Sequence, residues 1–113
     1  MAFSRVARLD QVPEHRGLCV QIGDIEVGLF RVGDSIHAME NLCPHAGFPL
    51  SEGVLDGCVV VCAAHGWDFD VTTGFKPSDP DGFPIACFAV RIEGEDIWVD
   101  IETQINRPPS RRR

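Results

Sequence analysis

The sequence lacks several features that would indicate other classes of protein. Its longest uninterrupted apolar run, Cys58–Ala64, has seven residues, whereas a transmembrane helix needs about 20. The first ten residues contain two arginines and no apolar stretch like that of a secretory signal peptide. No segment keeps a helical period, and there is no internal repeat, phosphate-binding glycine loop or nucleophile–base pair. These absences predict a cytoplasmic protein that does not bind membranes and is not itself an enzyme.

Basic residues are also scarce, and they are unevenly placed. The chain has 10 basic and 17 acidic residues, for a net charge of −7. Four of the basic residues lie in the last seven positions, so residues 1–106 hold 6 basic against 17 acidic residues, a balance of −11. A surface this acidic repels nucleic acid and favours a basic protein surface as a partner. Better solubility alone is the alternative explanation.

The pattern of turns and apolar residues predicts an all-β fold. With 113 residues the chain has the length of one domain. Turn dipeptides recur between apolar runs, for example Gly23-Asp24, Gly33-Asp34 and Gly94-Glu95. Apolar and polar residues alternate over 97–102, and they also alternate over 67–71, which is the period of a strand with one buried side.

Three segments do not fit this strand pattern. Residues 41–53 and Lys76–Pro84 are rich in proline, glycine and small residues, and we interpret them as ordered loops or as disorder. Residues 106–113 contain two prolines and several arginines, and we expect them to form a flexible basic tail. The predicted domain is therefore 1–105.

Two short motifs place cysteine beside histidine. They are Cys43-Pro44-His45 and Cys62-Ala63-Ala64-His65, with sixteen residues between His45 and Cys62. Two thiolates and two imidazoles can hold a tetrahedral zinc ion or an iron–sulfur cluster. Common zinc modules use a cysteine pair on one loop, whereas each loop here supplies one sulfur and one nitrogen. That mixture suits a [2Fe–2S] cluster with two cysteines on one iron and two histidines on the other.

The remaining cysteines and histidines give a weaker signal. Cys19, Cys58 and Cys87 lie in apolar, strand-like runs, where a free cysteine behaves as a small hydrophobic residue. An odd total of five cysteines argues against complete disulfide pairing. We expect His15 and His37 to be ordinary residues, because neither has a ligand partner nearby in the sequence.

The two motifs and their flanks resemble the Rieske family. The segment 43–47 is similar to its first cluster loop, 50–57 to the stretch between the loops in Rieske ferredoxins, and 65–74 to the second loop and its outgoing strand. The resemblance covers about residues 3–102. It implies an antiparallel β sandwich or barrel with a small cluster-binding subdomain at about 41–84. It also implies one [2Fe–2S] cluster bound by four residues: Cys43, His45, Cys62 and His65.

The resemblance further implies a function and its partners. A Rieske-type ferredoxin is a soluble one-electron carrier between an NAD(P)H-dependent flavoprotein reductase and a terminal oxygenase, either a ring-hydroxylating dioxygenase or a related monooxygenase. The expected docking surface lies near His45 and His65. Two alternatives stay open: a small Rieske-like subunit of an assimilatory nitrite reductase, and a zinc-stapled interaction domain.

Departures from one branch of that family predict a low reduction potential. The quinol-oxidising branch has a disulfide between the two loops, and the matching positions here are Phe48 and Ala64. Trp67 stands where that branch has a serine that donates a hydrogen bond toward the cluster. With fewer hydrogen-bond donors to the cluster, the electron that reduction adds is stabilised less. Lys76–Pro84 corresponds to a proline-containing loop over the cluster in family members, or is a plain surface loop.

Overall fold

The computed structural model describes residues 3–42, 48–62, 66–79, 82 and 84–106, and within them it confirms the all-β prediction. The larger sheet has the order β1 (Ser4–Arg8), β9 (Asp96–Gln104), β8 (Cys87–Glu93), β4 (Ser35–Glu40), β3 (Ile25–Val32), β2 (Leu18–Ile22). The smaller sheet has the order β5 (Val54–Asp56), β6 (Val59–Val61), β7 (Asp68–Asp70). Two short 3-10 helices, η1 (Leu9–Gln11) and η2 (Leu50–Glu52), complete the described elements.

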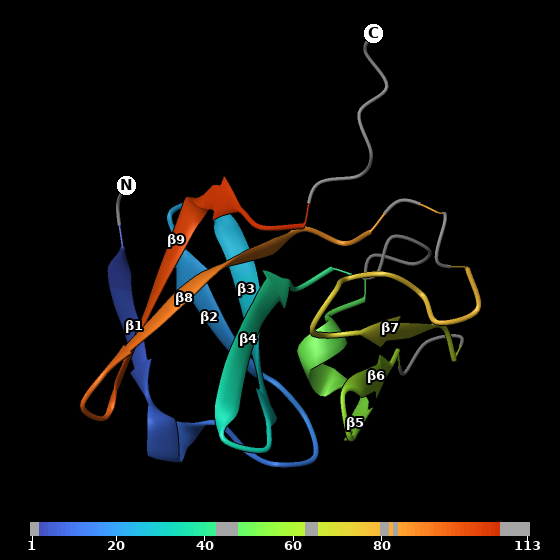
Figure 1. Ribbon diagram of the computed structural model, residues 1–113, viewed down its shortest axis with the longest axis horizontal. Coiled ribbons are helices and arrows are strands. Elements are labelled where there is room, and N and C mark those ends of the chain that lie inside the picture. The colour runs from blue at the N-terminus through green and yellow to red at the C-terminus, as the bar shows by residue number, and fades with distance from the viewer. Residues whose placement is uncertain (1–2, 43–47, 63–65, 80–81, 83, 107–113) are drawn as a thin grey trace, which may run out of the picture.

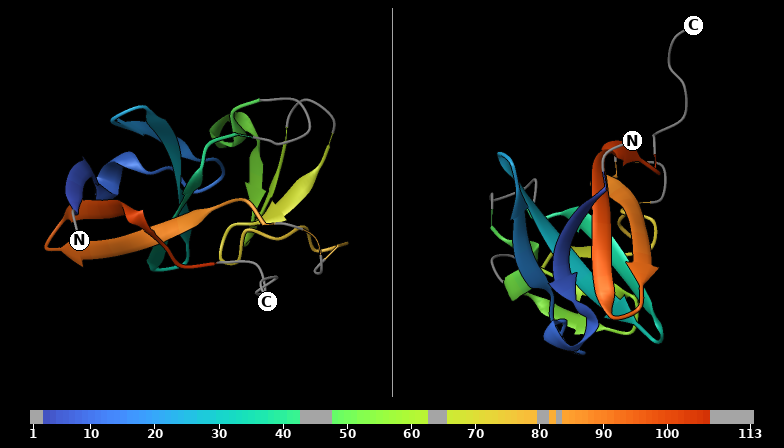
Figure 2. Two further views of the ribbon diagram at one scale, coloured as in Figure 1. Left: turned by 90° about the horizontal axis from the view of Figure 1, so that it is seen from above. Right: turned by 90° about the vertical axis from the view of Figure 1, so that its left-hand side faces the viewer.

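The larger sheet curls into a barrel. Neighbouring strands are antiparallel, and the two outer strands, β1 and β2, contact each other, so the barrel is nearly closed (Figures 1 and 2). The predicted turns fall between consecutive strands of this sheet. Gly23 and Gly33 have φ of 60° and 59°, a backbone conformation that glycine adopts without a Cβ clash and that two-residue hairpin turns require.

The smaller sheet is an insertion between two neighbouring strands of the barrel. β4 and β8 pair through Ala38 with Phe88 and through Met39 with Cys87. Between these strands the chain leaves the barrel, forms η2 and β5–β7, and then returns (Figure 1). Seen from above in Figure 2, the two sheets lie side by side. The division into a body of 1–105 with a cluster-binding part at about 41–84 stays a prediction.

Two hydrophobic cores follow from the period-2 alternation of the strands. On β3, Leu29 is buried in the barrel core with Val27 and Ile97, while the next residue, Phe30, is buried in a second core. This second core joins the small sheet to the barrel. Its buried residues are Phe30, Met39, Leu50, Leu55, Val60, Cys62, Phe69, Val71, Ile85 and Cys87. Both parts of the molecule therefore hold the predicted ligand region in place.

The last described residue, Asn106, is held by the body although the prediction assigned it to the tail. Its Nδ2 donates to the Thr73 and Ile85 carbonyl oxygens, each at 2.7 Å. Its Oδ1 accepts from the Cys87 amide at 2.7 Å. The end of β9 is thus tied to the junction of the two sheets. In the part of the chain that the structure describes, no helix has the length and apolar character needed to cross a bilayer.

Candidate metal centre

Of the four predicted ligands, Cys62 is the one that the structure describes. Cys62 directly follows β6, and its side chain lies in the second core with 1% of the residue exposed. Cys43, His45 and His65 lie outside the described residues. Within the ranges that are described, no three His, Cys, Asp or Glu side chains come together as a metal site. The ligand set therefore stays a prediction.

Two backbone hydrogen bonds close the second ligand loop at its base. The Cys62 amide donates to the Trp67 carbonyl oxygen at 2.7 Å, and the Gly66 amide donates to the Cys62 carbonyl oxygen at 3.0 Å. Gly66 has φ of 77°, which favours glycine at this position. The chain thus reverses between β6 and β7, and Cys62 stands at the start of the reversal.

A buried asparagine holds the base of the first ligand loop. Asn41, two residues before Cys43, is 1% exposed. Its Oδ1 accepts from the Ser51 amide at 2.7 Å, and its Nδ2 donates to Ser51 Oγ at 2.9 Å. The segments on either side of 43–47 are therefore joined by two buried hydrogen bonds. The sequence does not predict this pair, because its only local signal is the position of Asn41 two residues before a proposed ligand.

The flanks of the two ligand loops lie against each other. Val54 pairs with Val61 in the small sheet, and a Cβ on Gly53 would overlap the Val61 carbonyl oxygen. Only glycine fits this approach of two backbones. The chain leaving the first loop therefore passes directly beside the residue that precedes Cys62.

The chemistry of the donor set fits the predicted cluster. Cys62 presents a soft sulfur donor inside an apolar core, where a thiolate ligand of a buried iron is shielded from water. Leu42 and Phe48 flank the first loop, and they are 48% and 38% exposed. In the sequence they adjoin the part of the site that is predicted to lie outermost. The expected asymmetry, with sulfur inside and imidazole outside, stays a prediction.

The other three cysteines are predicted to be structural, and the structure describes all of them. Cys87 is buried on β8, where burial, and then the nearby Asp70 charge, raise the pKa of its thiol to about 12. Burial and Asp70 also raise the pKa of Cys58, whose Sγ lies 3.6 Å from Asp70 Oδ2. Both thiols are thus poor nucleophiles and poor metal ligands. Cys19 is exposed on β2, so its predicted role as a packed small residue is wrong; its position falls on the outward face of the strand.

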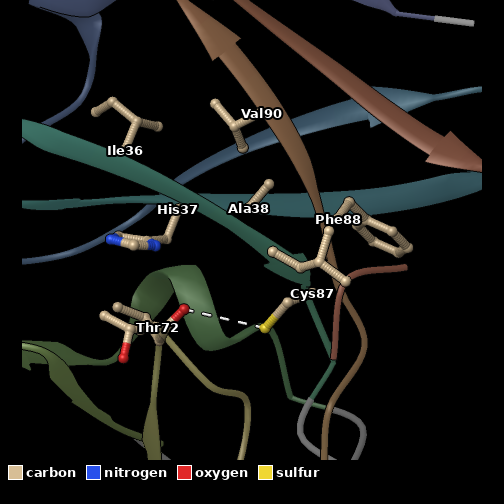
Figure 3. A pocket seen from close by; sticks show the side chains of 9 residues that line it. Ile36, His37, Ala38, Thr72, Cys87, Phe88 and Val90 are labelled. Carbon is tan, nitrogen blue, oxygen red and sulfur yellow. Dashed lines mark hydrogen bonds between the residues drawn. The ribbon is translucent and has the colours of Figure 1, made fainter. Parts of the chain in front are cut away.

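The structure also describes the other two histidines, His15 and His37. The His15 carbonyl oxygen accepts from the Leu55 amide at 2.8 Å. His37 lies on β4 at the edge of a cavity of about 180 Å³, with Nε2 3.0 Å from Ser35 Oγ. Figure 3 shows that His37 and Cys87 line this cavity from neighbouring strands, with Thr72 on the facing segment. Burial lowers the pKa of His37, and Asp70 opposes this shift.

Comparison with known proteins identifies the family. The Rieske [2Fe-2S] domain matches residues 2–89. The chain is 38% identical over 101 residues to the biphenyl dioxygenase ferredoxin subunit of Pseudomonas sp. (strain KKS102), covering 88% of this chain and 93% of that one. It superposes with a TM-score of 0.79 and 34% identity on the ferredoxin of carbazole 1,9a-dioxygenase from Nocardioides aromaticivorans IC177, covering 88% of this chain and 97% of that one.

The chain belongs to the Rieske [2Fe-2S] domain family, and the group implied is one [2Fe–2S] cluster. Its relatives are ferredoxin components of dioxygenase systems, which carry electrons and are not the catalytic enzymes. The ferredoxin in a complex of reduced oxygenase and oxidised ferredoxin of carbazole 1,9a-dioxygenase matches with a TM-score of 0.77 and 29% identity, covering 96% and 97% of the two chains. Small subunits assigned to nitrite reductases share the fold at 25% and 20% identity, with TM-scores of 0.76 and 0.74.

Proposed function

We propose that this protein is a one-electron carrier that takes electrons from an NAD(P)H-dependent flavoprotein reductase and passes them to a terminal oxygenase. The observation that carries the proposal is the placement of Cys62, which is buried directly after β6 and lies beside the flank of the first ligand loop. The identities of the relatives as ferredoxin components support the same conclusion. We propose Cys43, His45, Cys62 and His65 as the four ligands.

A bound [2Fe–2S] cluster supplies the one-electron chemistry. The chain's own contribution is to join the segments that flank the first ligand loop and to keep water from the Cys62 sulfur. The Asn41–Ser51 pair and the apolar residues around Cys62 serve these two purposes.

The proposed docking surface combines exposed apolar residues with acidic ones. Leu42, next to Cys43, lines a groove together with the carboxylates of Asp24, Glu26 and Glu40. Within the described part of the chain, none of these carboxylates forms an ion pair. We infer that a basic partner surface docks here, at the segment that leads into the first ligand loop. Electrostatic steering of this kind raises the association rate and makes it sensitive to salt.

Metal analysis tests the cofactor. Wild-type protein prepared without oxygen is expected to contain iron and acid-labile sulfide in equal amounts and to give a Rieske-type electron paramagnetic resonance signal when reduced. Cys62→Ser should lose both, whereas Cys87→Ser, which alters an equally buried cysteine of the same core, should keep them. A colourless wild-type protein that binds one zinc ion would instead support the interaction domain.

Reconstitution with partners tests the role. NAD(P)H with a flavoprotein reductase of a dioxygenase system should reduce the protein, and a terminal oxygenase should reoxidise it with turnover of an aromatic substrate. Copurification with a sirohaem subunit, without reduction by such a reductase, would favour the nitrite reductase alternative.

Charge substitutions test the docking surface. Glu26→Gln with Glu40→Gln should slow reduction by the reductase at low salt and weaken its salt dependence. Asp34→Asn serves as the matched control, since Asp34 lies in the β3–β4 turn, at the other end of β4 from Glu40. Equal effects of the two changes would place the partner elsewhere.

A further inference from the structure

Lys76 holds a positive charge beside the second ligand loop. Its Nζ lies 4.6 Å from the centroid of the Trp67 ring and 5.4 Å from that of Phe69. The same nitrogen lies 3.6 Å from Asp68 Oδ1. The Lys76 side chain is 25% exposed, so its ammonium group is partly removed from water. Cation–π contacts and a nearby carboxylate together fix the position of this charge.

The backbone connects this charge to a proposed ligand. Trp67 accepts the hydrogen bond from the Cys62 amide, so the residue under the ammonium group also closes the ligand loop. The segment that carries Lys76 is itself fixed. The Phe75 carbonyl oxygen accepts from the Asp70 amide at 2.9 Å, and the Lys76 carbonyl oxygen accepts from the Asp79 amide at 3.0 Å.

We propose that Lys76 is a positioning residue that raises the reduction potential of the protein. The inference rests on the proposed function, because it requires a one-electron site at Cys62 and the other three proposed ligands. Reduction adds one negative charge at that site, and a fixed cation nearby stabilises the reduced form relative to the oxidised form. Asp68 opposes this effect. Because the pair is partly buried, salt screens it less than it screens exposed charges.

A similar arrangement elsewhere in the chain provides a control. Arg91 Cζ lies 4.5 Å from the centroid of the Phe3 ring, and Arg91 Nε lies 2.9 Å from Glu93 Oε2. This cation, on β8, also combines an aromatic ring with a carboxylate, but it lies on the barrel, away from the small sheet (Figure 1). A purely structural role for Lys76 would make the two positions equivalent in a redox measurement.

The experiment is an equilibrium redox titration of the cluster-loaded full chain, followed by its visible spectrum and by electron paramagnetic resonance. At the wild-type midpoint potential, Lys76→Gln should lower the ratio of reduced to oxidised protein by about twofold to tenfold. Asp68→Asn should raise this ratio, and the double variant should return it toward the wild-type value. Lys76→Arg and Arg91→Gln should leave it within about twofold of wild type.

An unchanged ratio in Lys76→Gln would overturn the inference, as would an equal fall in Arg91→Gln. If Lys76→Gln cannot be prepared with a full complement of iron, Lys76→Met takes its place, because methionine keeps an apolar stem near the Trp67 and Phe69 rings and removes the charge. Absence of iron and labile sulfide from the wild-type protein is a different result, because it would refute the proposed function itself.

Discussion

Asn41 shows how a single polar residue can fix a ligand loop. Its side chain makes two hydrogen bonds to Ser51 in a buried setting. A buried donor that loses its partner costs about 1–3 kcal/mol. Asn41→Ala should therefore lower the free energy of unfolding by about 1–3 kcal/mol, measured by urea titration of samples matched for iron content. Ser51→Ala, which removes only the Oγ contact, should cost less; a loss in Asn41→Ala no larger than that of Ser51→Ala would contradict this account.

The cysteines allow a second test at the residue scale. The pKa of the Cys87 thiol is raised to about 12, and the thiolate is the reactive form. At pH 8, an alkylating reagent should modify exposed Cys19 and leave Cys87 unmodified until the protein is denatured. Peptide mass spectrometry before and after denaturation provides the measurement. Modification of Cys87 in the folded protein at a rate similar to that of Cys19 would show that the burial is not maintained in solution.

The motif residues could be predicted from the sequence, but the residues that support them could not. Cysteine beside histidine on two loops is a local pattern, and it predicts a ligand set that stays a proposal. Asn41, Gly53 and Lys76 act through segments that meet only in the folded chain. Asp100 is an error of another kind: alternation placed it on the solvent side, yet it is fully buried. It accepts hydrogen bonds from the Glu102 amide and Thr103 Oγ1, near an irregularity in the β8–β9 register.

Among the elements, the hairpins of the barrel and β7 were predictable, whereas β1 and β5 were not. β2, β3, β4, β8 and β9 follow the alternation and the turn dipeptides. β1 was missed because its partner, β9, lies at the other end of the sequence. β5 has three residues and takes its form from pairing with β6. Such strands depend on tertiary contacts more than on local preference.

His37 gives a prediction for the packing of β4 against the segment after β7. Burial lowers its pKa, although Asp70 acts in the opposite direction. When the pH falls below about 6.5, the ordinary pKa of histidine, His37 therefore takes up a proton more readily in the unfolded chain than in the folded chain. The stability that neutral His37 contributes is present above that pH and is lost as the pH falls.

Urea unfolding between pH 7.5 and 5 measures this effect. His37→Gln should make the fall in unfolding free energy shallower than in wild type. His15→Gln, at an exposed position outside the strands, serves as the control and should leave the slope unchanged. If His37→Gln and His15→Gln have the same slope as wild type, then His37 does not contribute to the pH dependence.

At the scale of the whole molecule, the net charge and the composition of the loops both lower the reduction potential. Residues 1–106 carry a balance of −11, and this negative field opposes the addition of an electron. Phe48 and Trp67 offer no hydroxyl or thiol at their positions. We expect a midpoint in the lower half of the range of Rieske centres, which is roughly −150 to +300 mV. A value in the upper half, measured by equilibrium titration, would contradict this expectation.

The separation of the two hydrophobic cores has a practical consequence. The barrel core contains no residue of the small sheet, whereas the core around Cys62 depends on both sheets. Oxidative damage that opens the inserted unit can therefore leave the barrel intact, giving a protein that is still folded, abundant and recognised by antibodies but has lost its colour. Visible absorbance and a protein blot therefore measure different quantities, because the first requires an intact inserted unit and the second requires only a folded barrel.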